Sequence, residues 1–158
     1  MTRFSARFLG RRLPCAIGRG GITRAKREGD GATPAGTHRV VALLYRPDRI
    51  PRPAIWARPI GPTDLWSDDV QDPDYNRLVR APHPFGHERL WRADPLYDLI
   101  LLTDWNWPDA RKGRGSAIFI HRWRKPRHPT AGCIALAPAT LLWIARSLRP
   151  GSRLVVRP

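Results

Sequence analysis

Seventeen prolines and thirteen glycines interrupt this chain of 158 residues so often that long helices have little room to form. Proline removes a backbone donor, and both residues favour turns, so this spacing is typical of short strands joined by loops. Only residues 137–148 (APATLLWIARSL) combine a proline in the first turn with apolar residues at helical spacing. The sequence therefore predicts a mainly β fold, a β-rich α+β protein, with one main helix.

The expected strands are short apolar runs bounded by turn residues, namely residues 12–18, 37–45, 96–102, 118–120 and 152–156. The run 96–102 is dominated by apolar residues without alternation, so we expect it to be buried on both faces. Residues 26–36 form a turn-dense loop, and five prolines in 46–62 favour an irregular connection. A short helical turn is expected near Asp72, with Pro73 at its first position. No repeat or domain boundary is visible, so residues 1–158 are predicted to form a single domain.

The candidate reactive residues lie in two segments, residues 115–121 (GSAIFIH) and residues 130–136 (TAGCIAL). An apolar strand ends on His121, and Cys133 follows twelve residues later, just before a second apolar run. This order can bring a thiol and an imidazole to the same end of a sheet. A thiolate beside an imidazole is far more reactive than a free thiol. We therefore predict a cysteine acyl-transfer site, with Cys133 as nucleophile and His121 as base.

Such a site also needs an orienting group for the base and donors for an oxyanion. The backbone carbonyl of Arg122 is predicted to fix the tautomer of His121. The backbone N–H groups of Ala131, Gly132 and Cys133 are predicted to point at one oxygen. A side chain at Gly132 is expected to obstruct the approach of a substrate.

Two other interpretations of these residues remain open. In the first interpretation, Cys133 is a buried core thiol, because free cysteines are commonly buried, and His121 is a surface histidine. The second is a metal site with His121, His128 and Cys133, extended by His83 and His87. No ligand pair near the cysteine has zinc-site spacing, so we expect no metal and no cofactor.

A formal net charge of +15 indicates attraction to anionic partners without naming them. Arginines spread from Arg3 to Arg157 supply most of it, and no basic arm with interleaved aromatic residues appears. Nucleic acid is therefore not expected as a partner, although a non-catalytic module that binds nucleic acid or cell wall remains an alternative.

Two cysteines make no disulfide framework, and Cys15 lies in an apolar patch typical of a core residue. We expect a monomer.

The N-terminal residues Met1–Ile17 carry arginines throughout and lack an apolar stretch long enough for a signal peptide. The pair Arg11-Arg12 precedes only a few apolar residues, so a twin-arginine signal is weak. No stretch approaches the length of a membrane span, so we expect no transmembrane segment. These residues alone favour a cytoplasmic location.

The two segments around His121 and Cys133 resemble the catalytic region of YkuD-type L,D-transpeptidases, bacterial enzymes that cross-link peptidoglycan. Their pattern is an apolar strand ending in His, a spacer, and Ser/Thr-x-Gly-Cys with an apolar residue; here these are FIH at 119–121 and TAGCIAL at 130–136. Residues 29–40 (GDGATPAGTHRV) resemble the Thr-Pro-x-Gly start of a strand in the same family. The resemblance begins near Gly29. It implies a YkuD-like β-sandwich or mixed sheet with long capping loops, and a catalytic domain over residues 1–158.

Two positions depart from the family pattern. Ala131 stands where the family commonly has His, and Ala135 where it often has Arg or Asn. The spacer between His121 and Cys133 is also short. These changes remove expected contacts to the donor stem peptide, while the nucleophile, the base and the backbone donors are retained.

The resemblance implies a two-step acyl transfer on peptidoglycan stem peptides. Cys133 attacks a diaminopimelate carbonyl of the donor and releases D-alanine, and the amine of an acceptor stem then resolves the thioester. The altered pocket makes an L-alanine-to-diaminopimelate linkage, or hydrolysis by a carboxypeptidase, more plausible than in a typical member. Family resemblance places such an enzyme in the periplasm or cell envelope.

Several residues near the cysteine are predicted to bind the stem peptide, with the basic ones contacting its carboxylates: Thr130, Arg122, Arg124, Lys125, Arg127 and His128. A solvated basic loop is an equally good interpretation of the charged ones. The aromatic and acidic segment from Trp66 to Tyr75, together with Trp105 and Trp107, is expected either to cap the cleft or to lie in the core.

Overall fold

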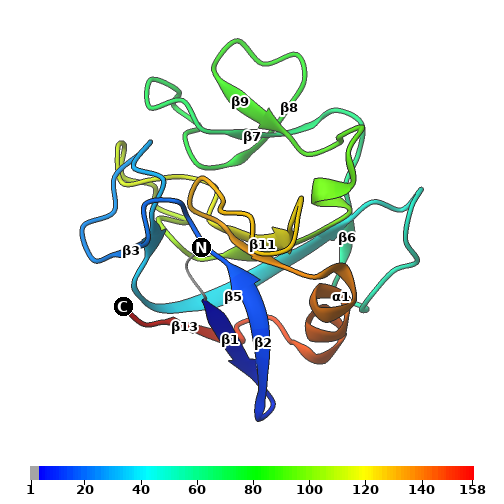
Figure 1. The fold of residues 1–158 in the computed structure, drawn as a ribbon. Helices are drawn as coiled ribbons and strands as arrows, with labels where there is room; N and C mark the ends of the chain where they lie inside the picture. Colours follow the sequence, from blue (N-terminus) through cyan, green and yellow to red (C-terminus); the bar gives the residue numbers. More distant parts are fainter. Residues whose placement is uncertain (1–3) are drawn as a thin grey trace.

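An eight-stranded mixed sheet organises the computed structural model, which describes residues 4–158 (Figure 1). Seven strands follow one another in the order β1 (Ser5–Phe8), β2 (Arg11–Ala16), β12 (Ile134–Leu136), β11 (Phe119–Arg122), β10 (Leu99–Thr103), β5 (Gly36–Tyr45) and β13 (Arg153–Val156). The eighth, β6 (Arg58–Pro59), pairs with β5. The pairs β11–β12 and β5–β6 are parallel, and the other pairs are antiparallel.

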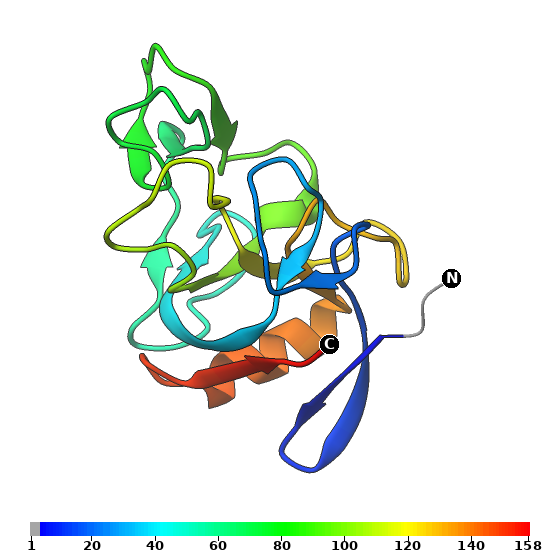
Figure 2. The same cartoon turned by 90° about the vertical axis from the view of Figure 1, so that its left-hand side faces the viewer.

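Smaller elements cover the two faces of this sheet. On one side lies the cap, a three-stranded sheet of β7 (Asp64–Ser67), β8 (Leu78–Arg80) and β9 (His87–Arg89), with the 3-10 helix η1 (Pro95–Tyr97) beside it. The helix α1 (Pro138–Ser147) packs on the other side. Figure 2 shows the β1–β2 hairpin projecting from the body of the molecule. A two-stranded sheet joins β3 (Ile22–Thr23) to β4 (Thr33–Pro34).

Most of the expected elements are present. The mainly β fold is confirmed, and α1, within the predicted 137–148, is the one α-helix among the described residues. The predicted strands correspond to β2, β5, β10, β11 and β13. Two expectations were wrong in part. Asp72 does cap a single turn, since its Oδ1 accepts from the Asp74 N–H, but that turn leads into β8 and forms no helix. Leu96 and Tyr97 belong to η1 because Asp94 caps that segment and accepts from the Leu96 N–H.

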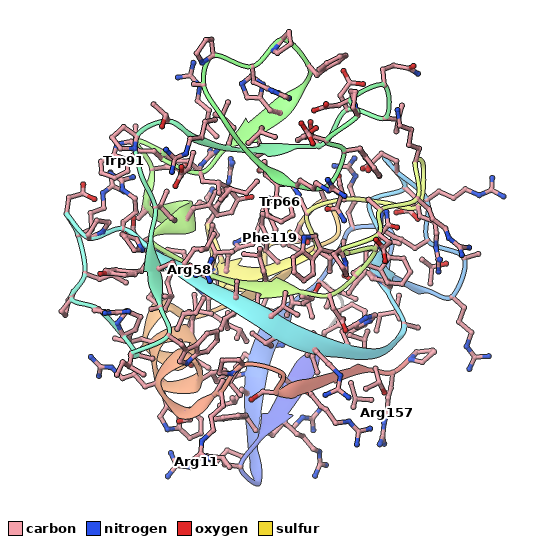
Figure 3. The ribbon with its side chains drawn as sticks, turned by 180° about the vertical axis from the view of Figure 1, so that it is seen from behind. Arg11, Arg58, Trp66, Trp91, Phe119 and Arg157 are labelled. Carbon is pink, nitrogen blue, oxygen red and sulfur yellow. The ribbon has the colours of Figure 1, made fainter. Side chains whose placement is uncertain are left out.

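Alternation along β10 creates two cores. Leu99 and Leu101 pack with Leu141 and Ile144 of α1, and Cys15 belongs to this same core, as predicted. Ile100 and Leu102 face the opposite way and pack beneath the cap. There the ring of Trp66 meets the ring of Phe119 edge-on, with centroids 5.1 Å apart (Figure 3). All five residues of β10 are buried, so the expectation of burial on both faces is confirmed.

Two arginines, Arg46 and Arg49, bind the segment that leads into η1. The Arg46 guanidinium is buried, stacks on Trp91 at 3.7 Å from the ring centroid, and donates to the Arg92 carbonyl over 2.7 Å. Arg49 donates to the Asp94 carbonyl over 3.0 Å and to Asp98 Oδ1 over 2.8 Å. The proline-rich connection after β5 therefore holds the chain that delivers Tyr97 to the cap side of the sheet.

Candidate active site

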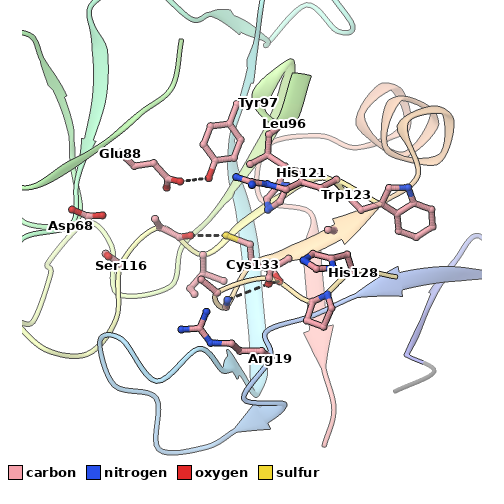
Figure 4. A pocket seen from close by; sticks show the side chains of 18 of the residues that line it. Arg19, Asp68, Glu88, Leu96, Tyr97, Ser116, His121, Trp123, His128 and Cys133 are labelled. Carbon is pink, nitrogen blue, oxygen red and sulfur yellow. Dashed lines mark hydrogen bonds between the residues drawn. The ribbon is translucent and has the colours of Figure 1, made fainter. Parts of the chain in front are cut away.

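The pairing of β11 with β12 places His121 and Cys133 on one face of the sheet. His121 pairs with Ala135 in this parallel ladder, and Cys133 lies two residues before Ala135. Side chains two residues apart on an extended chain point to the same face, which here is the face beneath the cap. Both side chains line a cavity of about 700 Å³ (Figure 4).

The thiol of Cys133 rests in a hydrogen-bonded position. Its Sγ donates to the Ala117 carbonyl over 3.0 Å and accepts from the Phe119 N–H over 3.4 Å. Burial is the main cause that raises the pKa of Cys133 to about 12, and the carboxylate of Glu88 adds to it. The Phe119 N–H and the Lys26 ammonium act in the opposite direction. At neutral pH the sulfur is therefore a protonated thiol.

The imidazole of His121 is buried and neutral. Its Nδ1 lies 2.7 Å from the Arg122 carbonyl, the partner proposed from the sequence. A carbonyl only accepts, so Nδ1 carries the proton and Nε2 keeps a lone pair. Burial lowers the pKa of His121 to about 4, although the Arg122 carbonyl opposes that shift. The arrangement provides an oriented base beside a protonated thiol.

The turn before Cys133 is closed by Thr130. Its Oγ1 accepts from the Gly132 N–H over 3.1 Å and donates to the Cys133 carbonyl over 2.5 Å. The Gly132 N–H, predicted as an oxyanion donor, is thus already engaged and would have to exchange Thr130 for a substrate oxygen. Ala131 is exposed at the rim of the cavity, and its role as a donor stays a prediction.

Gly132 also has a structural reason within the chain, while its predicted role in leaving room for a substrate stays a prediction. Its φ of +145° is rarely adopted by other residues, and a Cβ there would lie 3.1 Å from the Ala32 carbonyl oxygen. The constraint therefore comes from the chain itself, because the 31–34 segment packs directly against the turn.

Thr33, within the Thr-Pro-x-Gly segment, ties that segment to the cysteine turn. Its Oγ1 donates to the Gly132 carbonyl over 2.8 Å and accepts from the Gly18 N–H over 2.9 Å. The side chain is completely buried. Two motifs almost a hundred residues apart are therefore joined by one hydroxyl.

The predicted substrate-binding residues divide into two groups. Thr130, Arg124 and His128 line the cavity with the cysteine. Arg122, Lys125 and Arg127 are not among the lining residues. The Arg122 guanidinium lies 3.9 Å from Asp98 Oδ2 and borders a separate apolar pocket over α1.

The cap and the loops beside it contribute further residues to the cavity, and of these Asp68 lies in the Trp66–Tyr75 segment that the sequence offered as a cap of the cleft. Tyr97 of η1 presents its ring edge to the His121 imidazole, with centroids 5.4 Å apart, and its hydroxyl donates to Glu88 Oε1 over 2.6 Å. Three carboxylate residues line the cavity, Glu28, Asp68 and Glu88. No local motif marks Glu28 or Glu88, because each comes from a different loop or strand and they meet only in the folded chain.

Asn76 holds the cap to the loop that approaches the thiol. Its Oδ1 accepts from the Trp66 indole N–H and from the Ala117 N–H, both over 3.0 Å. Its Nδ2 donates to the carbonyls of Trp105 and Asn106. Trp66 is buried beneath the cap, so this member of the aromatic segment belongs to the core.

Within residues 4–158, no group of three or more His, Cys, Asp and Glu side chains is arranged to hold a metal ion. His83, one of the extra ligands considered above, instead places its Nε2 2.6 Å from Asp72 Oδ2. None of the described helices is long and apolar enough to cross a membrane.

The family model YkuD, the L,D-transpeptidase catalytic domain, matches residues 7–156. The chain belongs to this family. Searches of curated proteins and of solved structures gave no significant match. Membership supports an enzyme of the L,D-transpeptidase kind, and the match begins well upstream of Gly29, where the sequence resemblance became visible.

Proposed function

We propose that this protein is a peptidoglycan L,D-transpeptidase that acts through a thioester on Cys133, with His121 as its base. The observation that carries the proposal is the oriented, neutral imidazole of His121 on the same face and in the same cavity as the Cys133 thiol. A site for acyl transfer needs this pair together with room for an acyl donor. We further propose that residues 1–158 act as one catalytic domain in the cell envelope.

In the first step, Nε2 of His121 takes the thiol proton while Sγ attacks the carbonyl of the donor stem. The resulting oxyanion is stabilised by backbone N–H groups of the 131–133 turn. The C–N bond then breaks, His121 returns the proton to the departing amine, and D-alanine leaves from a standard donor. The amine of an acceptor stem then attacks the thioester, and its proton passes through His121 to Sγ.

A direct proton transfer within a neutral thiol–imidazole pair suits the charge state of these two side chains. Because burial raises the pKa of Cys133 to about 12 and lowers that of His121 to about 4, a resting thiolate–imidazolium pair is disfavoured. The proton then moves during attack, as in general-base catalysis. Sγ first has to leave the Ala117 carbonyl, so substrate binding is expected to accompany a rotation of the cysteine side chain.

Alanine at positions 131 and 135 favours a variant linkage. Ala135 lines the cavity beside His121, and Ala131 is exposed at its rim, so neither contributes the polar contacts typical of the family. We propose that the donor pocket accepts a stem other than the standard one, with the L-alanine-to-diaminopimelate linkage as the candidate. The proposed substrate contacts are Thr130, Arg124 and His128 at the cavity, with Arg122 at the end of β11 and Lys125 and Arg127 on the loop that follows.

The test is incubation of purified protein with muropeptide monomers, followed by mass spectrometry of the products and of the intact protein. We expect cross-linked dimers and a covalent adduct on Cys133, both lost in Cys133→Ala and in His121→Ala. Cys15→Ala is the matched control, because that thiol lies in the core away from the cavity and should leave both results intact.

Fragmentation of the dimers identifies the linkage, and trimmed monomers without dimers would indicate a carboxypeptidase instead. Full cross-linking by a folded Cys133→Ala protein would end the proposal. A carbapenem titration gives an independent measurement, since one adduct is expected on the unaltered protein and on Cys15→Ala, and none on Cys133→Ala.

A further inference from the structure

Glu88 places a carboxylate from the cap in the cavity that holds Cys133 (Figure 4). The Tyr97 hydroxyl donates to Glu88 Oε1 over 2.6 Å, and the Tyr97 ring packs edge-on against His121. Burial and the charge of Glu88 raise the pKa of Tyr97 well above its usual value, so the hydroxyl keeps the proton that it donates. The carboxylate is thus held in a fixed position close to the reacting residues.

No ion pair involving Glu88 occurs among residues 4–158. The neighbouring Arg92 is already paired with Asp94, over 2.7 Å. Burial is the main cause that raises the pKa of Glu88, and the charge of Asp68 adds to it, whereas the Tyr97 hydroxyl and the charges of Arg92 and Arg124 act in the opposite direction. A partly buried carboxylate is more stable when a cation pairs with it, and none of the salt bridges among residues 4–158 pairs a cation with Glu88.

Charged side chains of both signs line the cavity, and the charge of Arg124, one of the lining residues, acts on Glu88. Glu88 and Asp68 lie on the cap side of Cys133, whereas Arg19 and His128 lie on the other side (Figure 4). A chain with a formal charge of +15 and only 13 acidic residues has therefore gathered carboxylates at one wall of its reactive cavity. The basic wall suits the carboxylates of a donor peptide, and the acidic wall suits a group of positive charge.

We propose that Glu88, held by Tyr97, is a specificity residue that binds the ammonium group of the acceptor stem before it attacks the Cys133 thioester. This inference rests on the proposed function. A peptide amine is largely protonated at neutral pH and reaches the enzyme as an ammonium ion. It releases one proton to solvent before attack; its second passes through His121 to Sγ as the amide forms and the C–S bond breaks.

The experiment separates the two half-reactions. Cys133 is first acylated by a muropeptide donor, and the acyl-enzyme is then offered either a stem-peptide ammonium or hydroxylamine, which is uncharged at pH 7.5. In Glu88→Gln we expect acylation to continue, because removing the carboxylate removes one cause of the high pKa of Cys133. The KM for the ammonium acceptor should rise about 10- to 100-fold, the range for loss of one charged hydrogen bond. Transfer to hydroxylamine should be unchanged.

Glu28→Gln is the matched control, since Glu28 lines the same cavity but both of its carboxylate oxygens are engaged, Oε1 by the Gly29 N–H and Oε2 by the Tyr75 hydroxyl, whereas Glu88 accepts a side-chain hydrogen bond only at Oε1. It removes the same charge, and we expect a far smaller change in KM. An equal loss in both Gln variants, an equal loss with both nucleophiles, or an unchanged KM in Glu88→Gln would overturn the inference.

The unaltered protein provides a measurement that does not depend on the folding of a variant. Added salt should raise the KM for the ammonium acceptor and leave that for hydroxylamine unchanged, because only the former relies on charge attraction. Equal salt dependence of the two would also overturn the inference. Failure of the unaltered protein to form any acyl-enzyme would overturn the proposed function and this inference with it. If the unaltered protein is acylated normally, a negative result in the acceptor step overturns only the role of Glu88.

Discussion

Replacement of Thr33 by valine tests whether one buried hydroxyl holds the cysteine turn in place. Valine has nearly the same shape as threonine, so packing is retained while two hydrogen bonds are lost, one to the Gly132 carbonyl over 2.8 Å and one from the Gly18 N–H over 2.9 Å. Thr33 is completely buried, so water cannot readily replace the lost partner. A buried donor or acceptor left without a partner costs about 1–2 kcal/mol, which gives about 2–4 kcal/mol for the pair.

For a domain of this size, that loss corresponds to a decrease of about 5–15 °C in Tm. The assay is urea and thermal unfolding of Thr33→Val, paired with the rate of carbapenem acylation at Cys133. Acylation should slow by more than the unfolded fraction explains, because the Gly132 carbonyl belongs to the turn that presents the thiol. Thr33→Ser keeps the hydroxyl and should recover most of both quantities.

Thr23→Val is the matched control, since the Thr23 hydroxyl makes only a local bond with the Ala25 N–H near the surface. Its stability should change by less than about 0.5 kcal/mol, as is usual for surface substitutions. A Thr33→Val protein as stable as the control, with unchanged acylation, would refute the reasoning that Thr33 joins the two motifs.

Two further predictions concern the cap and the base. Asn76→Ala removes four hydrogen bonds at a buried position and should lower the free energy of unfolding by about 3–5 kcal/mol, measured by urea denaturation. Asn106→Ala, also at a positive φ but less buried, should cost clearly less, and equal losses would contradict the role assigned to Asn76. Because the pKa of His121 is lowered from 6.5 to about 4, the folded state binds fewer protons than the unfolded chain, so the free energy of unfolding should fall by about 3 kcal/mol as pH decreases from 6.5 to 4. That pH dependence should be largely absent in His121→Gln, and an identical slope in the variant would assign it to other groups.

The sequence was informative where local pattern and structure coincide. The proline and glycine distribution left 137–148 as the one strong helix, and α1 lies there. The apolar run before His121 and the run after Cys133 became neighbouring strands, so two reactive residues on separate segments met on one face. In each case, the determinant is a period or a turn residue that acts over a few positions.

The cap was harder to predict from the sequence because its residues act through long-range contacts. Tyr97 sits in an apolar run that favours a strand, yet the Asp94 cap and the arginines that hold the preceding segment give it a 3-10 turn instead. Glu88 follows a loop of turn residues and carries no motif. Glu88 reaches the cavity only because β9 packs opposite β11 in the folded chain. No residue spacing in the sequence indicates that arrangement.

The resting geometry of the thiol also links the cap to the timing of the reaction. Asn76 accepts from the Ala117 N–H, which helps to fix Ala117 at a φ of +49° with its carbonyl turned toward Sγ. The thiol proton is therefore directed at the Ala117 carbonyl and not at His121. A neutral thiol in this position reacts slowly with small electrophiles, since the thiolate is the reactive form. A donor whose carbonyl displaces this contact would free the proton for His121, so reactivity would appear only once the acyl donor is bound.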